Sequence, residues 1–497
     1  MIDEAVVRIG SQAGPVIGRR VFGGFLEHVG RAVYGGIYEP GHPSANADGM
    51  RTDVLDLVRE LGVTMVRYPG GNFVSAYDWE DGVGPKQDRP VRLDPAWHTL
   101  EPNQVGVGEF MAWAASAGVE PMMAVNLGTR GVADALRLLE YCNAPVGALA
   151  DLRRSHGSPD PYGVTLWCLG NEMDGPWQIG RRTPAEYGRI ADQTAHAMRA
   201  MDDSLQLIAC GASGPEVPWF EEWTREVLRT TYHTVDQLSC HWYVSGDDSD
   251  LTSYLASGVG MDGYIEQVVA LADETGAELG SDKRIGISFD EWNVWNIRRH
   301  SERDTITGMD NWPVAPPLLE EEYTLADAVV VGSLLMSLIA HAERVTGACL
   351  AQLVNAIAPI MTVTGGPAWR QTTFHPFALT APVAGGRLLP VTVDVPDLDT
   401  TRYGAVPTVQ AVACLGGEPE TLHVFAVNRD PARAVDLRVE PVAAGSTLEV
   451  ATLAGPDPYL TNTAAEPDRV VPVFTTQAAA EPVRLPPASW TRIRVAG

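Results

Sequence analysis

Eight short apolar runs alternate with longer amphipathic segments between Arg20 and Pro382, and this alternation constrains the fold more than any other feature of the chain. Repeated strand-and-helix units build a parallel sheet, and eight such units close a barrel. The predicted strands are Val21–Glu27, Thr64–Tyr68, Glu120–Leu127, Thr165–Gly170, Leu205–Cys210, Gln237–Tyr243, Arg284–Glu291 and Ala348–Leu353. The pattern therefore predicts an α/β fold in which residues 20–384 form a (β/α)8 TIM barrel.

Apolar residues at helical spacing fill the gaps between these runs. The predicted helices are Asp53–Leu61, Gly108–Ala117, Gly131–Cys142, Thr183–Met201, Pro218–Thr230, Tyr264–Thr275 and Ala326–Ala342. We expect the eighth helix, within Phe374–Val383, to be short or irregular, because Pro376 and Pro382 would disrupt its interior.

After Gly386 the apolar pattern changes to alternation with period two, as in Leu422–Val427 and Ser489–Val495. Proline, glycine and aspartate separate these runs, which is typical of short antiparallel strands in a sandwich. We therefore expect residues 385–497 to form a C-terminal antiparallel β-sandwich domain. The N-terminal segment 1–19 alternates weakly and should add a strand to that sandwich.

The chain carries a formal net charge of −27, and its lysines and arginines form no cluster. Nucleic acid and anionic membrane surfaces are therefore excluded as partners, since both would be repelled. The acidic Met1–Ala5 does not resemble a signal peptide, and no apolar run reaches membrane-spanning length. The six scattered cysteines show no metal-ligand spacing, so we expect buried thiols in a cytoplasmic protein. An export signal removed ahead of Met1 is the alternative.

Two glutamates follow apolar runs at matching positions of the predicted barrel. Glu172 comes after the fourth strand, in Trp167–Gly175, and Glu291 ends the seventh, in Ile287–Asn293. Hydrolysis of a glycosidic bond needs one protonated and one ionised carboxyl group on opposite sides of the bond. A single glutamate after a strand is more simply explained as a solvent-exposed loop residue. Two glutamates at the same mouth of a barrel favour a glycosidase.

Other polar and aromatic residues are expected at the same mouth, where buried polar groups must bind each other or a ligand. The polar ones are Glu27, Arg67, Asn72, Asn126, His241, Tyr243, Gln352 and Asn355. Trp97, Trp177 and Trp295 could pack on the apolar face of a sugar ring, whereas Trp292 is more consistent with the core. Gly70 and Gly71 would let the backbone approach the mouth closely.

Several long segments resemble the α-L-arabinofuranosidases of glycoside hydrolase family 51, whose acid and nucleophile lie on barrel strands four and seven. The matching segments are Gly23–Pro40, Arg67–Pro85, Glu140–Pro145, Trp167–Gly180 and Phe289–Trp295. The resemblance implies a retaining exo-glycosidase that removes terminal α-L-arabinofuranosides from arabinan, arabinoxylan or derived oligosaccharides. It also implies a reaction without metal or organic cofactor, and a homo-oligomer, which in this family is commonly a hexamer.

The resemblance assigns roles residue by residue. Glu172 would be the acid/base and Glu291 the nucleophile. Arg67 and His241 would support the nucleophile through hydrogen bonds. The residues implied to bind the sugar are Glu27, Asn72, Trp97, Asn171, Tyr243, Trp295 and Gln352.

Two alternatives keep the barrel and change its function. A β-D-galactofuranosidase or a β-xylosidase could use the same site, because galactofuranose shares the ring configuration of arabinofuranose and adds one exocyclic carbon. A non-catalytic carbohydrate-binding protein would keep the pocket without the reaction. Hydrolysis of aryl furanosides and xylosides distinguishes these possibilities.

Overall fold

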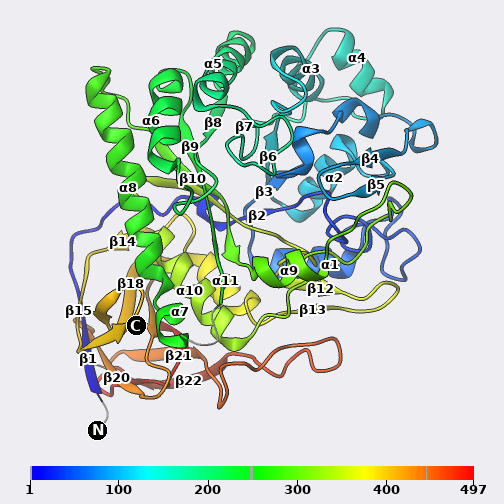
Figure 1. Ribbon diagram of the computed structural model, residues 1–497. Helices are drawn as coiled ribbons and strands as arrows, with labels where there is room; N and C mark the ends of the chain where they lie inside the picture. The colour runs from blue at the N-terminus through cyan, green and yellow to red at the C-terminus, as the bar shows by residue number, and fades with distance from the viewer. Residues whose placement is uncertain (1–2, 247–249, 444, 497) are drawn as a thin grey trace.

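The protein folds as a barrel joined to a β-sandwich (Figure 1), in a computed structural model that describes residues 3–246, 250–443 and 445–496. Eight parallel strands close in the order β10-β11-β2-β3-β6-β7-β8-β9, which confirms the predicted TIM barrel. They are β2 (Gly23–Phe25), β3 (Met65–Tyr68), β6 (Glu120–Ala124), β7 (Leu166–Leu169), β8 (Gln206–Cys210), β9 (Gln237–Val244), β10 (Gly286–Val294) and β11 (Val345–Leu350). The fourth and seventh barrel strands along the chain are thus β7 and β10.

Several barrel strands differ from their predicted bounds by two or three residues at an end, among them β2, β10 and β11. The 3-10 helix η1 (Arg19–Phe22) takes the start of the first apolar run and leaves only three residues for β2. The last strand, β11, ends before Leu353, although Leu353 and Val354 are fully buried. Buried apolar residues in a loop, such as Leu353, give the same sequence pattern as buried residues in a strand. The pattern indicates which residues are buried, but it does not show which of them form the hydrogen bonds of a sheet.

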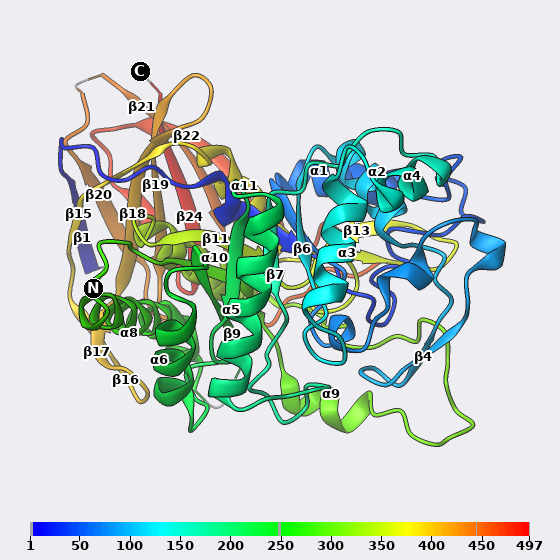
Figure 2. The same ribbon diagram turned by 90° about the horizontal axis from the view of Figure 1, so that it is seen from above.

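Helices pack around the barrel, as Figure 2 shows from above. The principal ones are α1 (Thr52–Leu61), α2 (Val107–Ala117), α3 (Val132–Asn143), α5 (Pro184–Met201), α6 (Phe220–Thr231), α8 (Ser257–Glu278), α10 (Leu325–Ala340) and the short α11 (Phe374–Thr380). Each coincides with a predicted helix. The short α4 (Ala148–Ser155), α7 (Leu251–Leu255) and α9 (Ile297–Arg303) were not predicted.

Helix α8 starts earlier than predicted because tertiary contacts override a weak local preference. Gly258, Gly260 and Gly263 lower the helix propensity of its first turns. A Cβ atom added at Gly260 would lie 2.6 Å from the ring of Trp242, so glycine permits close packing there.

Helix α10 is buried on every side, because it lies between the barrel and the sandwich. A Cβ atom at Gly332 would lie 2.4 Å from the ring of Trp490, which belongs to the last strand of the sandwich. Ser333 donates a hydrogen bond to Gln410 across the same boundary. The two parts of the chain are therefore closely packed against each other.

The sandwich consists of two sheets, ordered β15-β1-β20-β23 and β14-β18-β19-β24-β21-β22. Its strands are β1 (Asp3–Ile9), β14 (Arg387–Leu389), β15 (Val391–Asp394), β18 (Val409–Gly416), β19 (Thr421–Asn428), β20 (Val435–Glu440), β21 (Thr447–Leu453), β22 (Val473–Ala478), β23 (Val483–Leu485) and β24 (Ser489–Ala496). The N-terminal strand β1 pairs antiparallel with β15 and parallel with β20, so one pair departs from the antiparallel pattern. Side chains of both sheets, such as Val7 and Val424, share one apolar core.

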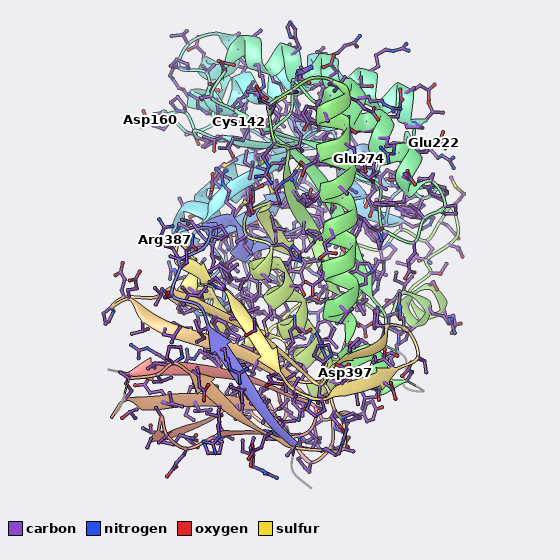
Figure 3. All side chains as sticks on the ribbon, turned by 90° about the vertical axis from the view of Figure 1, so that its left-hand side faces the viewer. Cys142, Asp160, Glu222, Glu274, Arg387 and Asp397 are labelled. Carbon is purple, nitrogen blue, oxygen red and sulfur yellow. The ribbon has the colours of Figure 1, made fainter. Side chains whose placement is uncertain are left out.

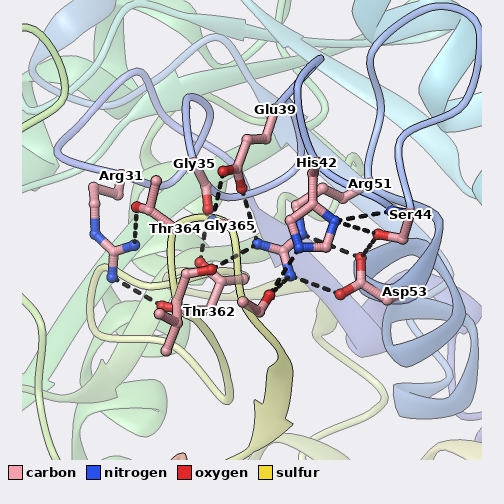
Figure 4. Close-up of polar contacts among 12 residues, drawn as sticks. Arg31, Gly35, Glu39, His42, Ser44, Arg51, Asp53, Thr362, Thr364 and Gly365 are labelled. Carbon is pink, nitrogen blue, oxygen red and sulfur yellow. Dashed lines mark hydrogen bonds and ion pairs between the residues drawn. The ribbon is translucent and has the colours of Figure 1, made fainter.

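The long connection between β2 and α1 is held by a buried arginine (Figure 4). Arg51 is fully buried and donates hydrogen bonds to Glu39 at 3.0 Å and to Asp53 at 2.6 Å. It also binds the carbonyl oxygens of Val363 and Gly366, in the hairpin of β12 (Ile360–Thr362) and β13 (Ala368–Arg370). This charge cluster is fully paired and has a structural role.

The six cysteines are free and buried, as predicted from their scattered positions. Figure 3 shows Cys142 inside the barrel domain, whereas Glu222 on α6 and Glu274 on α8 project outward. Within the described ranges, no helix combines the length and the apolar composition needed to cross a membrane.

Candidate active site

Glu172 and Glu291 meet at the carboxyl end of the barrel strands. One carboxylate oxygen of each lies within 4.8 Å of the other. Glu172 follows β7 with a φ of 41°, a left-handed conformation that a non-glycine residue rarely adopts outside functional sites. The separation resembles the roughly 5–5.5 Å of retaining glycosidases and is well below the roughly 6.5–9.5 Å of inverting ones.

Both oxygens of Glu291 are held by hydrogen-bond donors. Arg67, from β3, donates from Nη1 to Oε1 at 2.6 Å, and the Tyr243 hydroxyl donates to Oε2 at 2.7 Å. Arg67 is 1% exposed, so this contact is shielded from water and the guanidinium fixes the carboxylate in place.

Asp290 is a buried residue of the site that the sequence did not indicate. Its Oδ2 lies 3.4 Å from Arg67 Nε, and its side chain is 1% exposed. Burial opposes its charge, but the nearby Arg67 and His241 lower the pKa of Asp290 below its usual value. Consecutive strand residues normally face opposite sides, but the register of β10 shifts around these positions, which allows Asp290 and Glu291 to share the interior.

His241, predicted to support the nucleophile, hydrogen-bonds instead to the acid/base candidate. Its Nδ1 lies 2.8 Å from Glu172 Oε1 and 3.6 Å from Glu291 Oε2. Burial disfavours a charged imidazole, but the negative charge of Glu291 and contacts with Asp290 and Glu172 raise the pKa of His241 well above its ordinary value. The hydrogen-bond partner of His241 is thus Glu172, and its predicted support of the nucleophile stays a prediction, for which the 3.6 Å contact with Glu291 is the relevant distance.

Glu172 has the protonation behaviour expected of a general acid. Burial raises the pKa of its carboxyl group, and the hydrogen bond and positive charge of His241 oppose that rise. Its second oxygen, Oε2, accepts a hydrogen bond from Trp177 Nε1 at 2.6 Å. Trp177 is 51% exposed, so Oε2 faces the open side of the mouth.

Glu27 forms the inner wall of the site. Its Oε1 accepts hydrogen bonds from the Phe73 backbone N–H at 2.9 Å and from Trp97 Nε1 at 3.0 Å. Gln352 Nε2 donates to Oε2 at 2.9 Å. Burial and the charge of Glu291 raise the pKa of Glu27 to about 7. Trp97 reaches this point from the hairpin of β4 (Arg92–Asp94) and β5 (Thr99–Glu101).

Asn171 and Gly71 complete the inner wall. Asn171 Oδ1 accepts a hydrogen bond from Arg67 at 2.7 Å, whereas its buried Nδ2 has no partner among the described residues. An unpaired buried amide is costly, which suggests that Nδ2 serves a ligand. A Cβ atom at Gly71 would lie 2.8 Å from Glu291 Oε1, so this glycine allows the close backbone approach that the sequence suggested.

Glu172 and Glu291 are among the residues that line a cavity of about 390 Å³, a size suited to a small ligand, whereas the predicted sugar-binding residue Asn171 is not among them. Of the predicted sugar-binding residues, the cavity is lined by Glu27, Asn72, Trp97, Tyr243, Trp295 and Gln352. Asn126 and Asn355 were expected at the mouth, but they are not among the lining residues. Asn126 binds the backbone of its own turn, and Asn355 binds Thr362 and the Arg31 carbonyl oxygen. Trp292 is fully buried, as expected for a core residue.

Glu172, His241 and Glu291 also form the group of described residues whose ligand atoms lie close enough together to hold a metal ion. The same atoms are engaged with each other or with Arg67, Tyr243 and Trp177. The expectation of a reaction without metal therefore stays a prediction.

Two family models match the chain. The α-L-arabinofuranosidase 1 domain matches residues 57–255, and the α-L-arabinofuranosidase C-terminal domain matches residues 290–489. The chain is 53% identical to an intracellular exo-α-(1→5)-L-arabinofuranosidase of Streptomyces lividans, over 96% of this chain and 73% of the relative. It is 49% identical to an exo-α-(1→6)-L-arabinofuranosidase of Bifidobacterium longum, over 96% and 94%.

Solved structures agree with these relatives. A family 51 α-L-arabinofuranosidase from Bifidobacterium longum superposes with a TM-score of 0.93 at 43% identity, covering 100% of both chains. An α-L-arabinofuranosidase from Thermotoga maritima, solved as an arabinose complex, superposes with a TM-score of 0.86 at 33% identity, covering 99% of both chains. The chain therefore belongs to the α-L-arabinofuranosidases of glycoside hydrolase family 51.

Proposed function

We propose that this protein is a retaining exo-α-L-arabinofuranosidase that uses Glu291 as nucleophile and Glu172 as acid/base. The observation that carries the proposal is the arrangement of the two carboxyl groups. They lie within 4.8 Å of each other, Arg67 and Tyr243 hold one, and burial raises the pKa of the other. One group is thereby suited to attack and the other to donate a proton.

The reaction proceeds by two displacements. Glu291 attacks the anomeric carbon and forms a glycosyl ester while the glycosidic bond breaks, and Glu172 gives its proton to the departing oxygen. A water molecule then attacks the anomeric carbon, and Glu172 takes a proton from that water as the ester bond breaks. Glu291 is released as a carboxylate, Glu172 is protonated again, and the sugar keeps its anomeric configuration.

The inner wall provides the groups that bind the furanose. Asn171 Nδ2 is available to a hydroxyl oxygen, and we assign it to the 2-hydroxyl beside the nucleophile. Glu27 and Gln352 accept and donate hydrogen bonds deeper in the pocket. Trp97 and Trp295 supply apolar ring surface, and Asn72 is a further polar residue that lines the cavity.

The natural substrate is proposed to be an arabinan, arabinoxylan or derived oligosaccharide with terminal α-L-arabinofuranose. The names of relatives include both α-(1→5) and α-(1→6) linkages, so the linkage has to be measured. Several relatives are named as intracellular enzymes, which supports a cytoplasmic location. A homo-oligomer, of six chains as is common in the family, is also proposed.

The test is a panel of 4-nitrophenyl glycosides with α-L-arabinofuranose, β-D-galactofuranose and β-D-xylose. We expect the arabinofuranoside to be hydrolysed fastest, and NMR of the first product to show retained anomeric configuration. The Glu291→Ala variant should abolish turnover. Preference for the galactofuranoside or xyloside would replace the proposed substrate, and binding without turnover would indicate a carbohydrate-binding protein.

A further inference from the structure

The side of the cavity that receives the leaving group can be located from the acid/base candidate. A general acid must lie against the oxygen that it protonates, so the leaving group lies beside the outward-facing Oε2 of Glu172. Trp177 flanks this oxygen. This step, and the inference built on it, rests on the proposed function.

The loop between β8 and α6 forms the second wall of that side. Pro215, Glu216 and Val217 line the same cavity. Asp174 ties the loop to the segment after β7, since its Oδ2 accepts hydrogen bonds from the Ser213 backbone N–H at 2.9 Å and from Trp219 Nε1 at 2.8 Å. The loop and Trp177 therefore line the same cavity beside Glu172.

A hairpin from the C-terminal part of the chain reaches this loop. It consists of β16 (Asp397–Thr400) and β17 (Gly404–Pro407), and it lies beside α8 in Figure 2 and at the labelled Asp397 in Figure 3. Its turn is anchored on α7, because the Arg402 backbone N–H donates to Ser253 Oγ at 3.1 Å and Thr401 binds Asp250. The Arg402 guanidinium forms an ion pair with the Glu216 carboxylate.

We propose that Glu216 binds hydroxyl groups of a sugar leaving group and that Arg402 positions Glu216 for this contact. A carboxylate accepts hydrogen bonds and sugar hydroxyls donate them. The neighbouring wall residues Pro215, Val217 and Trp177 offer mainly apolar surface, so Glu216 is the acceptor that distinguishes a sugar from an aryl group there.

The ion pair between Arg402 and Glu216 contributes little to folding stability. The side chains of Arg402 and Glu216 are 49% and 72% exposed, and exposed ion pairs contribute little to folding. Its position matters more, because Arg402 Nη2 holds Glu216 Oε1 and thereby limits the rotamers of a carboxylate at the cavity wall. The second domain would thus set the preference for the leaving group.

The experiment compares kcat/KM for α-1,5-linked arabinobiose with kcat/KM for 4-nitrophenyl α-L-arabinofuranoside, whose leaving group has no sugar hydroxyls. In Glu216→Gln and Arg402→Met we expect the ratio of the two values to fall about tenfold, the size expected for loss of a charge-assisted hydrogen bond. The change should appear mainly as a higher KM for arabinobiose, because ground-state binding is lost. Arg402→Lys should stay closer to wild type than Arg402→Met.

Arg484→Met is the matched control, since Arg484 forms a comparable exposed pair with Asp436 in the sandwich. This variant should keep the wild-type ratio. An unchanged ratio in both Glu216→Gln and Arg402→Met would overturn the inference, as would an equal loss on both substrates in Arg402→Met with Arg402→Lys no better. Failure of the wild-type enzyme to hydrolyse the aryl arabinofuranoside would instead refute the proposed function.

Discussion

His241 Nδ1 lies 2.8 Å from Glu172 Oε1 and 3.6 Å from Glu291 Oε2, so a single imidazole stands between the two carboxyl groups of the site. Its contacts favour the charged form. Arg67 and His241 then place two positive charges beside Asp290 and Glu291. The hydrogen bond and charge of His241 lower the pKa of Glu172, but burial outweighs them, so that pKa stays above its ordinary value.

The first prediction concerns the pH dependence of the His241→Asn variant. Activity is lost as pH rises through the pKa of Glu172, because the deprotonated acid cannot protonate the leaving group. His241 lowers that pKa in the wild type, so its replacement should move the alkaline limb of kcat/KM to higher pH. Glu27, whose pKa is about 7, is the other candidate for the limb. Glu27→Gln should leave the limb in place, and a shift of the His241→Asn limb to lower pH would contradict the assignment.

The second prediction separates the two chemical steps through Glu172→Ala. Hydrolysis of an arabinose disaccharide should fall by about 10²–10⁴-fold, because its leaving oxygen needs a proton, whereas 4-nitrophenol leaves without one. Azide should restore turnover of the aryl substrate by replacing the activated water, and the product should be the glycosyl azide with retained configuration. Equal losses on both substrates would exclude Glu172 as the acid.

The third prediction concerns Asp290, which is paired with the buried Arg67. Asp290→Asn removes one partner of a buried charge pair and should lower the free energy of unfolding by about 3 kcal/mol, measured by urea denaturation. Asp436→Asn breaks the exposed pair with Arg484 and should cost less than about 1 kcal/mol. Equal effects of the two substitutions would mean that the buried pair is not important for stability.

The fourth prediction uses the close approach of the backbone at Gly71. In Gly71→Ala the new methyl group would lie 2.8 Å from Glu291 Oε1 and 3.4 Å from Glu27 Oε2. Displacement of the nucleophile should reduce kcat about a hundredfold, since misplacement of a catalytic group by about 1 Å has that effect. Gly41→Ala, which meets nothing within 4 Å, should retain wild-type kcat. Wild-type activity in Gly71→Ala would show that the site tolerates this displacement.

The fifth prediction concerns metal ions. The two displacements need only the two carboxyl groups and water, so prolonged treatment with a chelator should leave kcat/KM unchanged. Metal analysis of the untreated protein is the control. A loss of activity that added metal restores would assign a metal to the Glu172, His241 and Glu291 group.

The predicted fold agreed with the structure where burial has a regular period. Eight strands and eight helices followed from apolar spacing, because that spacing decides which face of an element is buried. The same reasoning missed the start of α8, where Gly260 packs closely against Trp242 and Tyr403. It also extended the last barrel strand over Leu353, a buried loop residue.

The residues of the candidate site were also predicted only in part. Polar residues at strand ends and long family-like segments were enough to select Glu172, Glu291 and the residues of the inner wall. Asp290 was missed, since its inward position depends on the register shift in β10. Asn126 was expected among the polar groups at the barrel mouth, but its side chain binds the backbone of its own turn, because a local hydrogen bond was available.

The sequence by itself determined the order of the strands, the chemical groups placed at their carboxyl ends and the family to which these groups belong. Only the tertiary structure decided which groups touch: His241 with Glu172, Asp290 with Arg67, and Arg402 with Glu216. The physical reason is that periodicity specifies which face of an element is buried. The direction of a side chain within that face depends on register, bulges and the packing of segments far apart in the chain.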